Sequence, residues 1–388
     1  MFLAVISHKP CWRSGNSASG FATDGGFPFQ MDALSQLFDA TEVLVPVYEG
    51  QSADGEGPLT GHNLRVRALP AIRGRGLRRK VAMIGWTLRC LPVLIWSIMR
   101  ADAVHTPIPG DVGTVGMVLA FLLRKPLFVR YCGNWFKADT IAERFWHWFI
   151  ERFAGGRNVM LATGGGSEHP SMRNRNVQWI FSTTLTRNEL DKYGSARNLR
   201  HGGPARLVIA CRQEIKKGTD VVIRSLPLLA IQQPGITLSV IGDGAMLTEF
   251  RRLAKTLGVD TAVIFHGKAS HQRVIELLLQ ADLFVFPTTS SEGFPKVVLE
   301  ALGCGLPVIA TRVSVIGQLI GAGGGVLIDE AAPEEVAEAV KKCLGDEELY
   351  RAMSQHAADT AKQYSLERWR DNIEAFLQQA WGPLTSEP

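Results

Sequence analysis

Two carboxylates stand eight residues apart in the stretch SEGFPKVVLEALGCGLPVIAT, which covers residues 291–311. Glu292 lies before a Gly-Phe-Pro break and Glu300 lies after it. An ionised carboxylate accepts several hydrogen bonds, so each of the two could hold a pair of hydroxyl groups. The break between them suggests that they meet different parts of one polar ligand.

The elements around the break predict how these carboxylates are positioned. Leu283–Pro287 has the composition of a buried strand, residues 288–294 form a loop, and Pro295 suits the first turn of a helix that runs to about Leu302. The start of a helix after a parallel strand binds phosphate through free N–H groups and the positive end of the dipole. Glu300 follows Pro295 by five residues, which is ~7 Å along the helix at ~1.5 Å per residue.

This spacing fits a nucleotide-sugar. The start of the helix and Glu300 are ~7 Å apart, at ~1.5 Å of helix rise per residue. The distance between the diphosphate of a nucleotide and the hydroxyl groups of its ribose is about the same. Glu300 could therefore bind the ribose, while Glu292, on the other side of the phosphates, could bind the sugar. Taken alone, Glu300 would more often be a solvated helix residue, so a second signal is needed.

That second signal is a pair of cations after an earlier strand. Arg212 and Lys217 lie in CRQEIKKGTD, around a turn at Gly218 and directly after the expected strand Arg206–Cys211. Cations at the carboxyl edge of a parallel sheet can neutralise a diphosphate and stabilise it as it leaves. A third loop, residues 241–246, carries Gly-Asp-Gly, which is a weak signal by itself.

Short β-branched runs alternate with segments of helical length throughout the chain, as in proteins with parallel sheets covered on both faces. We expect an α/β protein with two Rossmann-like, doubly wound parallel-sheet domains that face a central crevice. The polar stretch 187–204 divides the strands evenly. The twelve expected strands are Phe2–Ser7, Thr41–Val47, Leu64–Leu69, Ala103–Thr106, Leu127–Tyr131, Asn158–Ala162, Arg206–Cys211, Thr237–Ile241, Val263–His266, Leu283–Pro287, Pro307–Ala310 and Gly325–Ile328.

Composition sets the class of protein and its surroundings. The 388 residues are 46% hydrophobic and 20% charged, which is ordinary for a soluble globular protein. The six cysteines include no Cys-x-x-Cys pair, so neither a zinc site nor a disulfide framework is indicated, and a reducing cytoplasm fits best. Residues 1–200 carry 24 Lys and Arg against 15 Asp and Glu, whereas residues 201–388 carry 18 against 22. An anionic surface should therefore meet the first half.

The second half resembles the retaining GT-B glycosyltransferases of family 4, the glycosyl transferases group 1. The resemblance is carried by LVIACRQEIKKGTDVVI, VIGDGAM, VIFHGK, ADLFVFPTTSSEGFPKVVLEALGCGLPVIAT and GGGVLI. It covers about residues 205–345 strongly and the first half in outline. It implies an enzyme that transfers a hexosyl-type sugar from a UDP- or GDP-sugar, with retention of configuration and with neither a metal nor a cofactor. No Asp-x-Asp metal motif occurs in the sequence.

The resemblance also implies roles for individual residues. It implies that the cations Arg212 and Lys217 bind the donor pyrophosphate and that Glu300 binds the ribose. Glu292 would hold the sugar in catalysis. The remaining residues expected at the donor are Gly293, Phe294, Pro295, Lys296 and Lys268.

This resemblance implies that the chain is divided into three segments. Residues 1–186 would form an acceptor domain, residues 205–364 the nucleotide-sugar domain, and residues 365–388 a helix that crosses back to the first domain. Residues 365–381 fit such a helix, because Leu366, Trp369, Ile373, Phe376 and Leu377 fall on one side.

The first half matches the family less closely. Family members carry paired glycines against the donor phosphate, and Gly25-Gly26 match them within a long polar loop, residues 8–26. Where the family has a His before a Gly after the fifth strand, this chain has Cys132-Gly133. Asn134, and also Arg130, are candidate replacements with a catalytic role. His105, at the end of the fourth expected strand, could face the crevice.

One segment of the first half could meet a membrane. RGRGLRRK, residues 73–80, holds five cations and runs into nineteen mostly apolar residues, 81–99. Arg89 disfavours a transmembrane helix and Pro92 should break it. The segment is either a buried helix on the first sheet or a helix whose basic, exposed side rests on anionic lipid. We expect a cytoplasmic enzyme, peripheral on the inner face of the membrane, that extends a lipid-linked or cell-surface polysaccharide precursor without binding nucleic acid.

Other functions remain open at this point. A GT-B sugar-nucleotide epimerase or a phosphorylase-like enzyme would use the same nucleotide site, although an epimerase should show further carboxylates. A glycosyltransferase with a soluble, natural-product acceptor is a further alternative. The missing His also allows a sugar-binding protein without activity.

Overall fold

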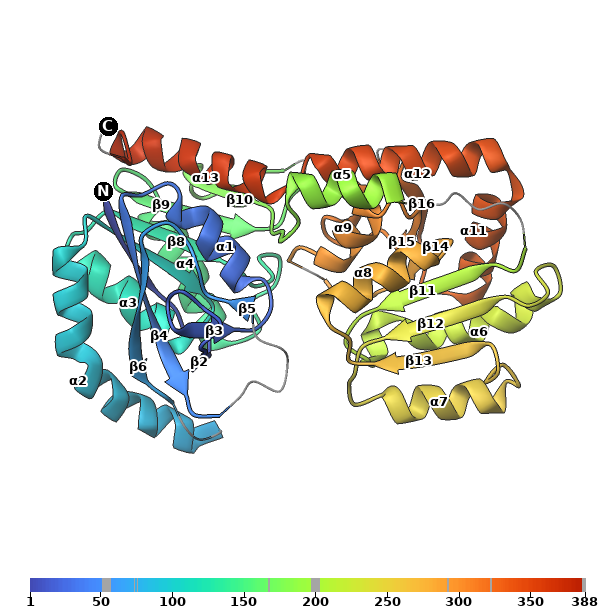
Figure 1. The fold of residues 1–388 in the computed structure, drawn as a ribbon, viewed down its shortest axis with the longest axis horizontal. Coiled ribbons are helices and arrows are strands. Elements are labelled where there is room, and N and C mark those ends of the chain that lie inside the picture. The colour runs from blue at the N-terminus through green and yellow to red at the C-terminus, as the bar shows by residue number, and fades with distance from the viewer. Residues whose placement is uncertain are drawn as a thin grey trace. The chain divides into compact units, whose positions relative to one another are not determined.

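The computed structural model describes residues 1–50, 57–72, 74, 76–166, 168–196, 203–291, 293–321 and 323–385. The chain forms two compact units (Figure 1). The first unit comprises Met1–Thr184 and Leu366–Pro388, and the second comprises Leu185–Ser365. The C-terminal segment expected to return to the first domain is thus part of the first unit. The expected divider at residues 187–204 contains the helix α5 (Arg187–Ala196), which packs on α9 and α12 inside the second unit.

The first unit is built on a ten-stranded sheet with the order β10-β9-β8-β7-β1-β4-β2-β3-β5, in which β6 also pairs with β4. The pairs among the long strands are parallel, as predicted. The strands are β1 (Phe2–Ile6), β2 (Cys11–Arg13), β3 (Phe21–Thr23), β4 (Ala40–Tyr48), β5 (Gly57–Pro58), β6 (Leu64–Pro70), β7 (Ala103–Ile108), β8 (Leu127–Tyr131), β9 (Asn158–Thr163) and β10 (Val177–Ile180).

Five helices cover the two faces of this sheet: α1 (Phe27–Ser35), α2 (Gly76–Arg100), α3 (Asp111–Leu122), α4 (Ile141–Phe153) and α13 (Leu366–Trp381). Apolar residues of α2, α3 and α4 share one core with alternate residues of the central strands, such as Ile6, Val104 and Val129. α13 lies against α1, β9 and β10. Its buried residues Leu366, Trp369, Ile373 and Leu377 are four of the five predicted to face inward, whereas Phe376 is only half-buried.

The second unit contains a six-stranded parallel sheet with the order β13-β12-β11-β14-β15-β16. Its central strands β14 and β15 are apolar and buried, as expected where helices cover both faces of a sheet; all four residues of each are buried. The strands are β11 (Arg206–Ala210), β12 (Thr237–Ile241), β13 (Val263–Gly267), β14 (Leu283–Phe286), β15 (Val308–Thr311) and β16 (Gly325–Ile328). The other elements are η1 (Ile215–Lys217), α6 (Thr219–Ala230), α7 (Leu247–Thr256), α8 (His271–Gln280), α9 (Lys296–Gly303), α10 (Ile316–Ile320), α11 (Pro333–Gly345) and α12 (Glu347–Lys362).

All twelve predicted strands are present, with ends within two residues of the predicted ones, and the two doubly wound domains are confirmed. Three details of the prediction were wrong. The polar loop 8–26 contains the hairpin β2–β3, which extends the sheet beyond β4. The short strands β5 and β10 were missed. Finally, α2 continues through Pro92 and curves (Figure 1). Pro92 has no N–H group to donate to the carbonyl of Leu88, four residues earlier. Both residues are exposed, so water can hydrogen bond to that carbonyl.

Candidate functional site

A cavity of about 710 Å³ opens at the carboxyl edge of the second sheet. Its wall is formed by the segments that follow β11, β12 and β13, together with α8 and α9. The order of the strands reverses between β11 and β14, and ligands of open α/β sheets bind at such a point. The lining residues are Ala210, Cys211, Arg212, Ile241, Gly242, Asp243, Gly244, Lys268, Ala269, Val274, Val297 and Glu300.

The Gly-Asp-Gly loop, a weak signal in the sequence, packs so closely on the segment after β11 that it requires glycine. Gly242 has a φ of +114°, and a Cβ atom there would lie 1.9 Å from the Cys211 carbonyl oxygen. A Cβ atom on Gly244 would lie 2.5 Å from the Gln213 carbonyl oxygen. The two segments therefore form one rigid wall of the cavity.

Gln213, which the sequence did not single out, holds this wall together. Its side chain is buried, and Nε2 donates to the carbonyl oxygens of Cys211 and Ile241, both at 3.0 Å. Its Oε1 accepts from Thr219 Oγ1 at 2.9 Å, and its backbone N–H donates to the Asp243 carbonyl. Gln213 thus joins the ends of β11 and β12 to the start of α6. The only signal in the sequence was its place beside Arg212.

The two predicted cations have different surroundings. Arg212 lines the cavity, is 76% exposed, and has Nη1 3.2 Å from Oε1 of Glu214. Lys217 ends the short helix η1, is only 7% exposed, and is not among the lining residues. The loop that carries Lys217 is fixed to the segment after β14, because Thr288 Oγ1 and Thr289 N donate to the Lys216 carbonyl.

Glu300 lies within α9 and lines the cavity, with its side chain 13% exposed. Its Oε1 is 3.5 Å from Nδ1 of His271, the first residue of α8. Burial raises the pKa of Glu300, while His271 and Lys296 act to lower that pKa. A largely buried carboxylate with open cavity before it can accept hydrogen bonds from a ligand's hydroxyls. His271 is a second residue that the sequence did not reveal.

The start of α9 carries the other predicted donor residues. The helix begins at Lys296 with Pro295 as its N-cap, one residue later than predicted. Gly293 to Lys296 lie directly before or at this start and do not line the cavity, to which α9 contributes Val297 and Glu300. The Phe294 ring packs on Tyr364, with centroids 5.8 Å apart. Glu292 lies outside the described residues. Lys268, after β13, is exposed and lines the cavity with Arg212 and Glu300.

The remaining predicted residues belong to the first unit. Gly25, with a φ of +65°, and Gly26 directly precede α1, and Gly26 is its N-cap. Lys9 forms an ion pair with Asp24 next to these glycines. Asn134 Oδ1 accepts from the Phe136 backbone N–H at 3.0 Å.

Two candidates of the first unit are interior residues. His105 does not face a crevice: it is buried in β7, stacks on Phe128 and hydrogen bonds to the Phe128 carbonyl at 3.0 Å. Burial lowers its pKa to about 3, so the imidazole is neutral. Arg130 is also buried, donates to Gln30 Oε1 at 2.7 Å and stacks over Trp369. These contacts give both residues a structural role.

Comparison with known proteins supports this assignment of the cavity. Residues 195–360 match the family model "Glycosyl transferases group 1", and this range includes every element from β11 to α11 in full. The predicted resemblance to this family is confirmed over these residues. The match covers the residues around the cavity, including Arg212, Lys268 and Glu300.

Curated relatives match over the same part of the chain. The N-acetyl-alpha-D-glucosaminyl L-malate synthase of Bacillus anthracis is 33% identical over 149 residues, which are 38% of this chain and 38% of that protein. The GDP-mannose-dependent alpha-(1-6)-phosphatidylinositol monomannoside mannosyltransferase of Mycolicibacterium smegmatis is 29% identical over 180 residues, 44% of this chain and 46% of that protein. The chain thus spans less than half the length of these relatives.

Solved structures match over nearly the whole chain. The crystal structure of Anabaena Alr3699/HepE in complex with UDP and glucose has a TM-score of 0.69 and 17% identity, and the match covers 97% of this chain and 99% of that one. The GT-B fold is therefore confirmed for both units of this chain, each taken by itself.

Proposed function

We propose that this protein is a retaining, metal-independent glycosyltransferase that moves a hexosyl-type sugar from a UDP- or GDP-sugar to a glycan acceptor. The observation that carries the proposal is the cavity at the carboxyl edge of the second sheet, where Arg212, Lys268 and Glu300 come together within residues that match the family. A cation and a buried carboxylate in one cavity suit the diphosphate and the ribose of such a donor.

Different residues hold each part of the donor in this proposal. Glu300 accepts hydrogen bonds from the ribose hydroxyls, and Lys268 faces the same cavity. Arg212, Lys217 and the N–H groups at the start of α9 meet the diphosphate. Glu292 and the backbone of Gly293–Lys296 hold the sugar. Gly25 and Gly26 bring their backbone to the donor phosphate, and Asn134 takes the place of the family's His.

In the transfer step the bond between the sugar C1 and the phosphate oxygen breaks, and the nucleoside diphosphate leaves with the electron pair. The cations stabilise the charge that develops on the leaving group. The acceptor hydroxyl oxygen forms its bond to C1 from the same face, and its proton passes to the departing phosphate oxygen. No cofactor is consumed.

We further propose that the acceptor is a lipid-linked or cell-surface polysaccharide precursor and that the enzyme is peripheral on the inner face of the cytoplasmic membrane. Support comes from α2. Trp86, Cys90 and Leu94 of this helix are buried, whereas Ile84 and Leu88 are 66% and 68% exposed. Its first turns carry Arg78, Arg79 and Lys80; residues 73 and 75 of the basic run lie outside the described residues.

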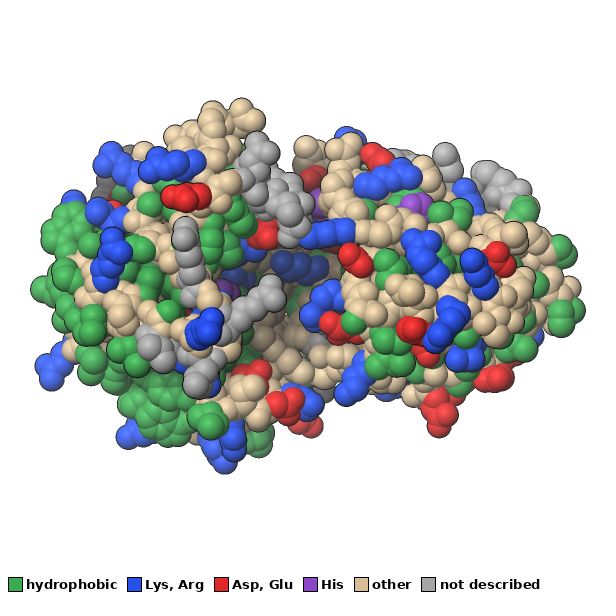
Figure 2. Space-filling view, turned by 90° about the horizontal axis from the view of Figure 1, so that it is seen from below, with side chains coloured by type: hydrophobic (Ala, Val, Ile, Leu, Met, Phe, Trp, Pro, Cys, Tyr) green, Lys and Arg blue, Asp and Glu red, His purple; other side chains and the backbone are tan. Residues whose placement is uncertain are grey.

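Among the described residues, one helical stretch, Arg78–Arg100, has the length and hydropathy of a membrane span. Within it, 29% of an apolar segment of 18 residues is buried. Core helices of soluble proteins meet the same criteria of length and composition. Because one side of α2 packs on β1, β6 and α3, a surface position suits it better than a span. Figure 2 shows hydrophobic side chains gathered on the surface of the first unit, on the side where Figure 1 places α2.

The experiment is a transfer assay with radiolabelled UDP-glucose, UDP-galactose, UDP-N-acetylglucosamine and GDP-mannose, each with and without a bacterial lipid extract as acceptor. The proposal predicts labelled glycolipid from one donor, with the anomeric configuration of the donor by NMR and with full activity in EDTA. Conversion of the donor to another sugar nucleotide without acceptor would indicate the epimerase. Inversion of configuration, or loss of activity in EDTA with rescue by manganese, would contradict the mechanism.

A further inference from the structure

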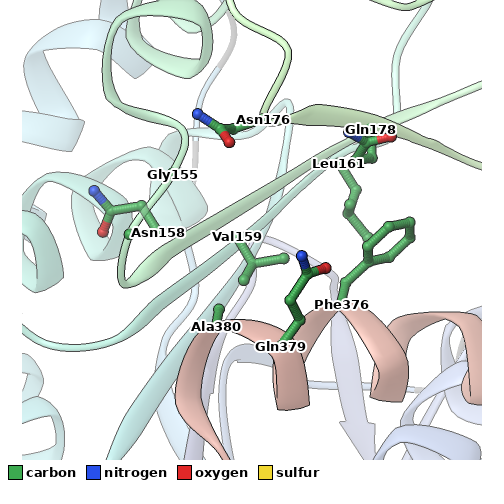
Figure 3. Close-up of a pocket in the computed structure, with 10 residues that line it drawn as sticks. Gly155, Asn158, Val159, Leu161, Asn176, Gln178, Phe376, Gln379 and Ala380 are labelled. Atoms are coloured by element: carbon green, nitrogen blue, oxygen red, sulfur yellow. The ribbon is translucent and has the colours of Figure 1, made fainter.

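A second cavity, of about 380 Å³, opens in the first unit between α13 and the edge of the sheet (Figure 3). Phe376, Gln379 and Ala380 of α13 form one wall. The opposite wall comes from segments more than 190 residues earlier in the chain, namely the turn before β9, β9 itself and β10. Its lining residues are Gly155, Gly156, Asn158, Val159, Leu161, Asn176 and Gln178.

The walls of this pocket are fixed by contacts between its segments. The indole Nε1 of Trp381 donates to the Arg157 carbonyl at 2.9 Å, which fastens the end of α13 to the turn before β9. Gly155 has a φ of +114°, and a Cβ atom there would lie 2.7 Å from Asn176 Nδ2. Val159 and Leu161 are buried and form an apolar base. The pocket is thus preformed in the folded unit.

The chemistry of the lining is neutral and rich in amides. None of the ten lining residues carries a charge, and four have side-chain amides: Asn158, Asn176, Gln178 and Gln379. The first three donate their N–H groups to backbone carbonyls, of Phe153 at 3.0 Å, Ala154 at 3.4 Å and Arg175 at 2.7 Å. These bonds fix which end of each amide is tied to the protein. Within the described part of the chain, no residue donates to the three amide oxygens, which remain as acceptors.

This arrangement selects one class of ligand. Acceptor oxygens in a lining that contains no cation disfavour an anion, and a lining without a carboxylate is poor for a divalent cation. A neutral molecule with many hydroxyl groups satisfies the acceptors, and the half-buried ring of Phe376 offers an apolar face for C–H groups. In Figure 3, Phe376 and Gln379 both extend from α13 toward β9, so the ring and the amide lie at the same cavity.

We propose that this pocket binds a neutral saccharide unit of a glycan. A volume of about 380 Å³ is near the lower end of the range of ~300–1,000 Å³ for small-molecule pockets, which suits one or two sugar rings. The inference goes beyond the proposed function, because oligosaccharide binding in the first unit requires no transfer activity. A glycan held here would stay associated with the protein between encounters with the nucleotide site.

The test is saturation-transfer difference NMR of the full chain with maltohexaose, α-1,6-linked mannohexaose and cellohexaose. We expect at least one of these neutral oligosaccharides to give a signal with the wild-type protein. Gln379→Ala removes an exposed side chain of the pocket and should weaken that binding by about fivefold, the effect of one lost hydrogen bond. Phe376→Ala should abolish the signal. The matched control is Gln378→Ala, the adjacent exposed amide, which bonds to Glu374 at 3.0 Å and lies outside the pocket.

Loss of the signal in Phe376→Ala and weaker binding in Gln379→Ala, with binding retained in Gln378→Ala, support the site. Absence of a signal from all three oligosaccharides, or equal binding by wild type and Gln379→Ala, overturns it. Calorimetry with UDP and GDP on the same samples separates this result from the proposed function. The pocket variants should bind nucleotide as the wild type does, and oligosaccharide binding without nucleotide binding would contradict the proposed function alone.

Discussion

The Nδ1 atom of His271 lies 3.5 Å from the Oε1 atom of Glu300, beside the cavity that Glu300 lines. The two residues come from different helices, α8 and α9, so the contact depends on the tertiary fold. Burial raises the pKa of Glu300. His271 and Lys296 oppose this effect, and the effect of His271 is the larger of the two. Ionised Glu300 can therefore accept hydrogen bonds from a ligand in the cavity. Its burial in the ionised form lowers the stability of the ligand-free protein.

Glu300→Gln should stabilise the ligand-free protein at neutral pH. In the unfolded chain the carboxyl ionises near its ordinary pKa of 4.5, whereas in the folded protein its pKa is higher. Ionisation of Glu300 therefore favours the unfolded state, and this effect is absent below pH 4.5 and grows as the pH rises through the folded pKa.

Urea unfolding at pH 4 and pH 7.5 checks this prediction. The variant should gain free energy of unfolding over the wild type at pH 7.5, and the gain should shrink at pH 4. Glu338→Gln, at a surface pair with Lys341, serves as the control and should show little change at either pH. A variant that is less stable than the wild type at pH 7.5 would show that Glu300 is satisfied within the protein.

Arg212→Ala and Lys217→Ala should each lower turnover by about 100-fold or more, because preorganised charges at a leaving group contribute ~3–4 kcal/mol. The control is Lys216→Ala, since the Lys216 side chain is exposed and only its carbonyl makes the contacts to Thr288 and Thr289. Initial rates at saturating donor, with circular dichroism to confirm folding, measure the effect. Wild-type rates in either variant would remove that cation from the donor site.

Gln213→Ala should destabilise the second unit by about 2–4 kcal/mol, because it removes three buried side-chain hydrogen bonds, two to the Cys211 and Ile241 carbonyls and one from the Thr219 hydroxyl. It should also weaken nucleotide binding, since the walls of the cavity lose their common support. Thermal unfolding measures the first effect, with Gln232→Ala on the surface as the control. A loss of stability no greater than that of the control would mean that the two segments hold together without Gln213.

The membrane proposal predicts that the protein floats with vesicles containing anionic lipid at low salt and is released at high salt. Replacing Arg75, Arg78, Arg79 and Lys80 by Ser should release it, since each cation near anionic lipid contributes ~1 kcal/mol. Replacing Arg224, Arg251, Arg252 and Lys255 of the second unit by Ser removes the same charge elsewhere and should leave flotation intact. Protein that stays in the soluble fraction at low salt would favour a soluble acceptor.

Much of the fold could be predicted because its strands and helices are strongly patterned. Runs such as LFVF in β14 are buried on both faces and are apolar throughout, so their position in the sequence marks the sheet. The hairpin β2–β3 and the strands β5 and β10 could not be predicted, because they have two to four residues and depend on pairing with neighbouring strands. The predicted break of the helix at Pro92 was wrong for a related reason. Whether a proline breaks a helix depends on whether the freed carbonyl can reach water, and Pro92 lies on an exposed side of α2.

The candidate site divides in the same way. Arg212 and Glu300 could be identified because they follow strand ends and a helix start, which are local features. Gln213 and His271 could not, because their roles come from contacts between loops and helices that are distant in sequence. His105 is an example of a wrong prediction from a local feature. Its position at a strand end suggested that it faces the crevice, but its side chain is buried against Phe128 and is neutral.

The most direct test of the donor site is isothermal titration calorimetry of UDP and GDP into the wild-type protein and into Glu300→Gln. We predict that the wild type binds one of these nucleotides, and that the variant binds it at least about tenfold more weakly, because a charge-assisted hydrogen bond contributes ~1.5–3 kcal/mol. Failure of the wild type to bind either nucleotide, or equal affinity of wild type and Glu300→Gln, would contradict the assignment of the cavity.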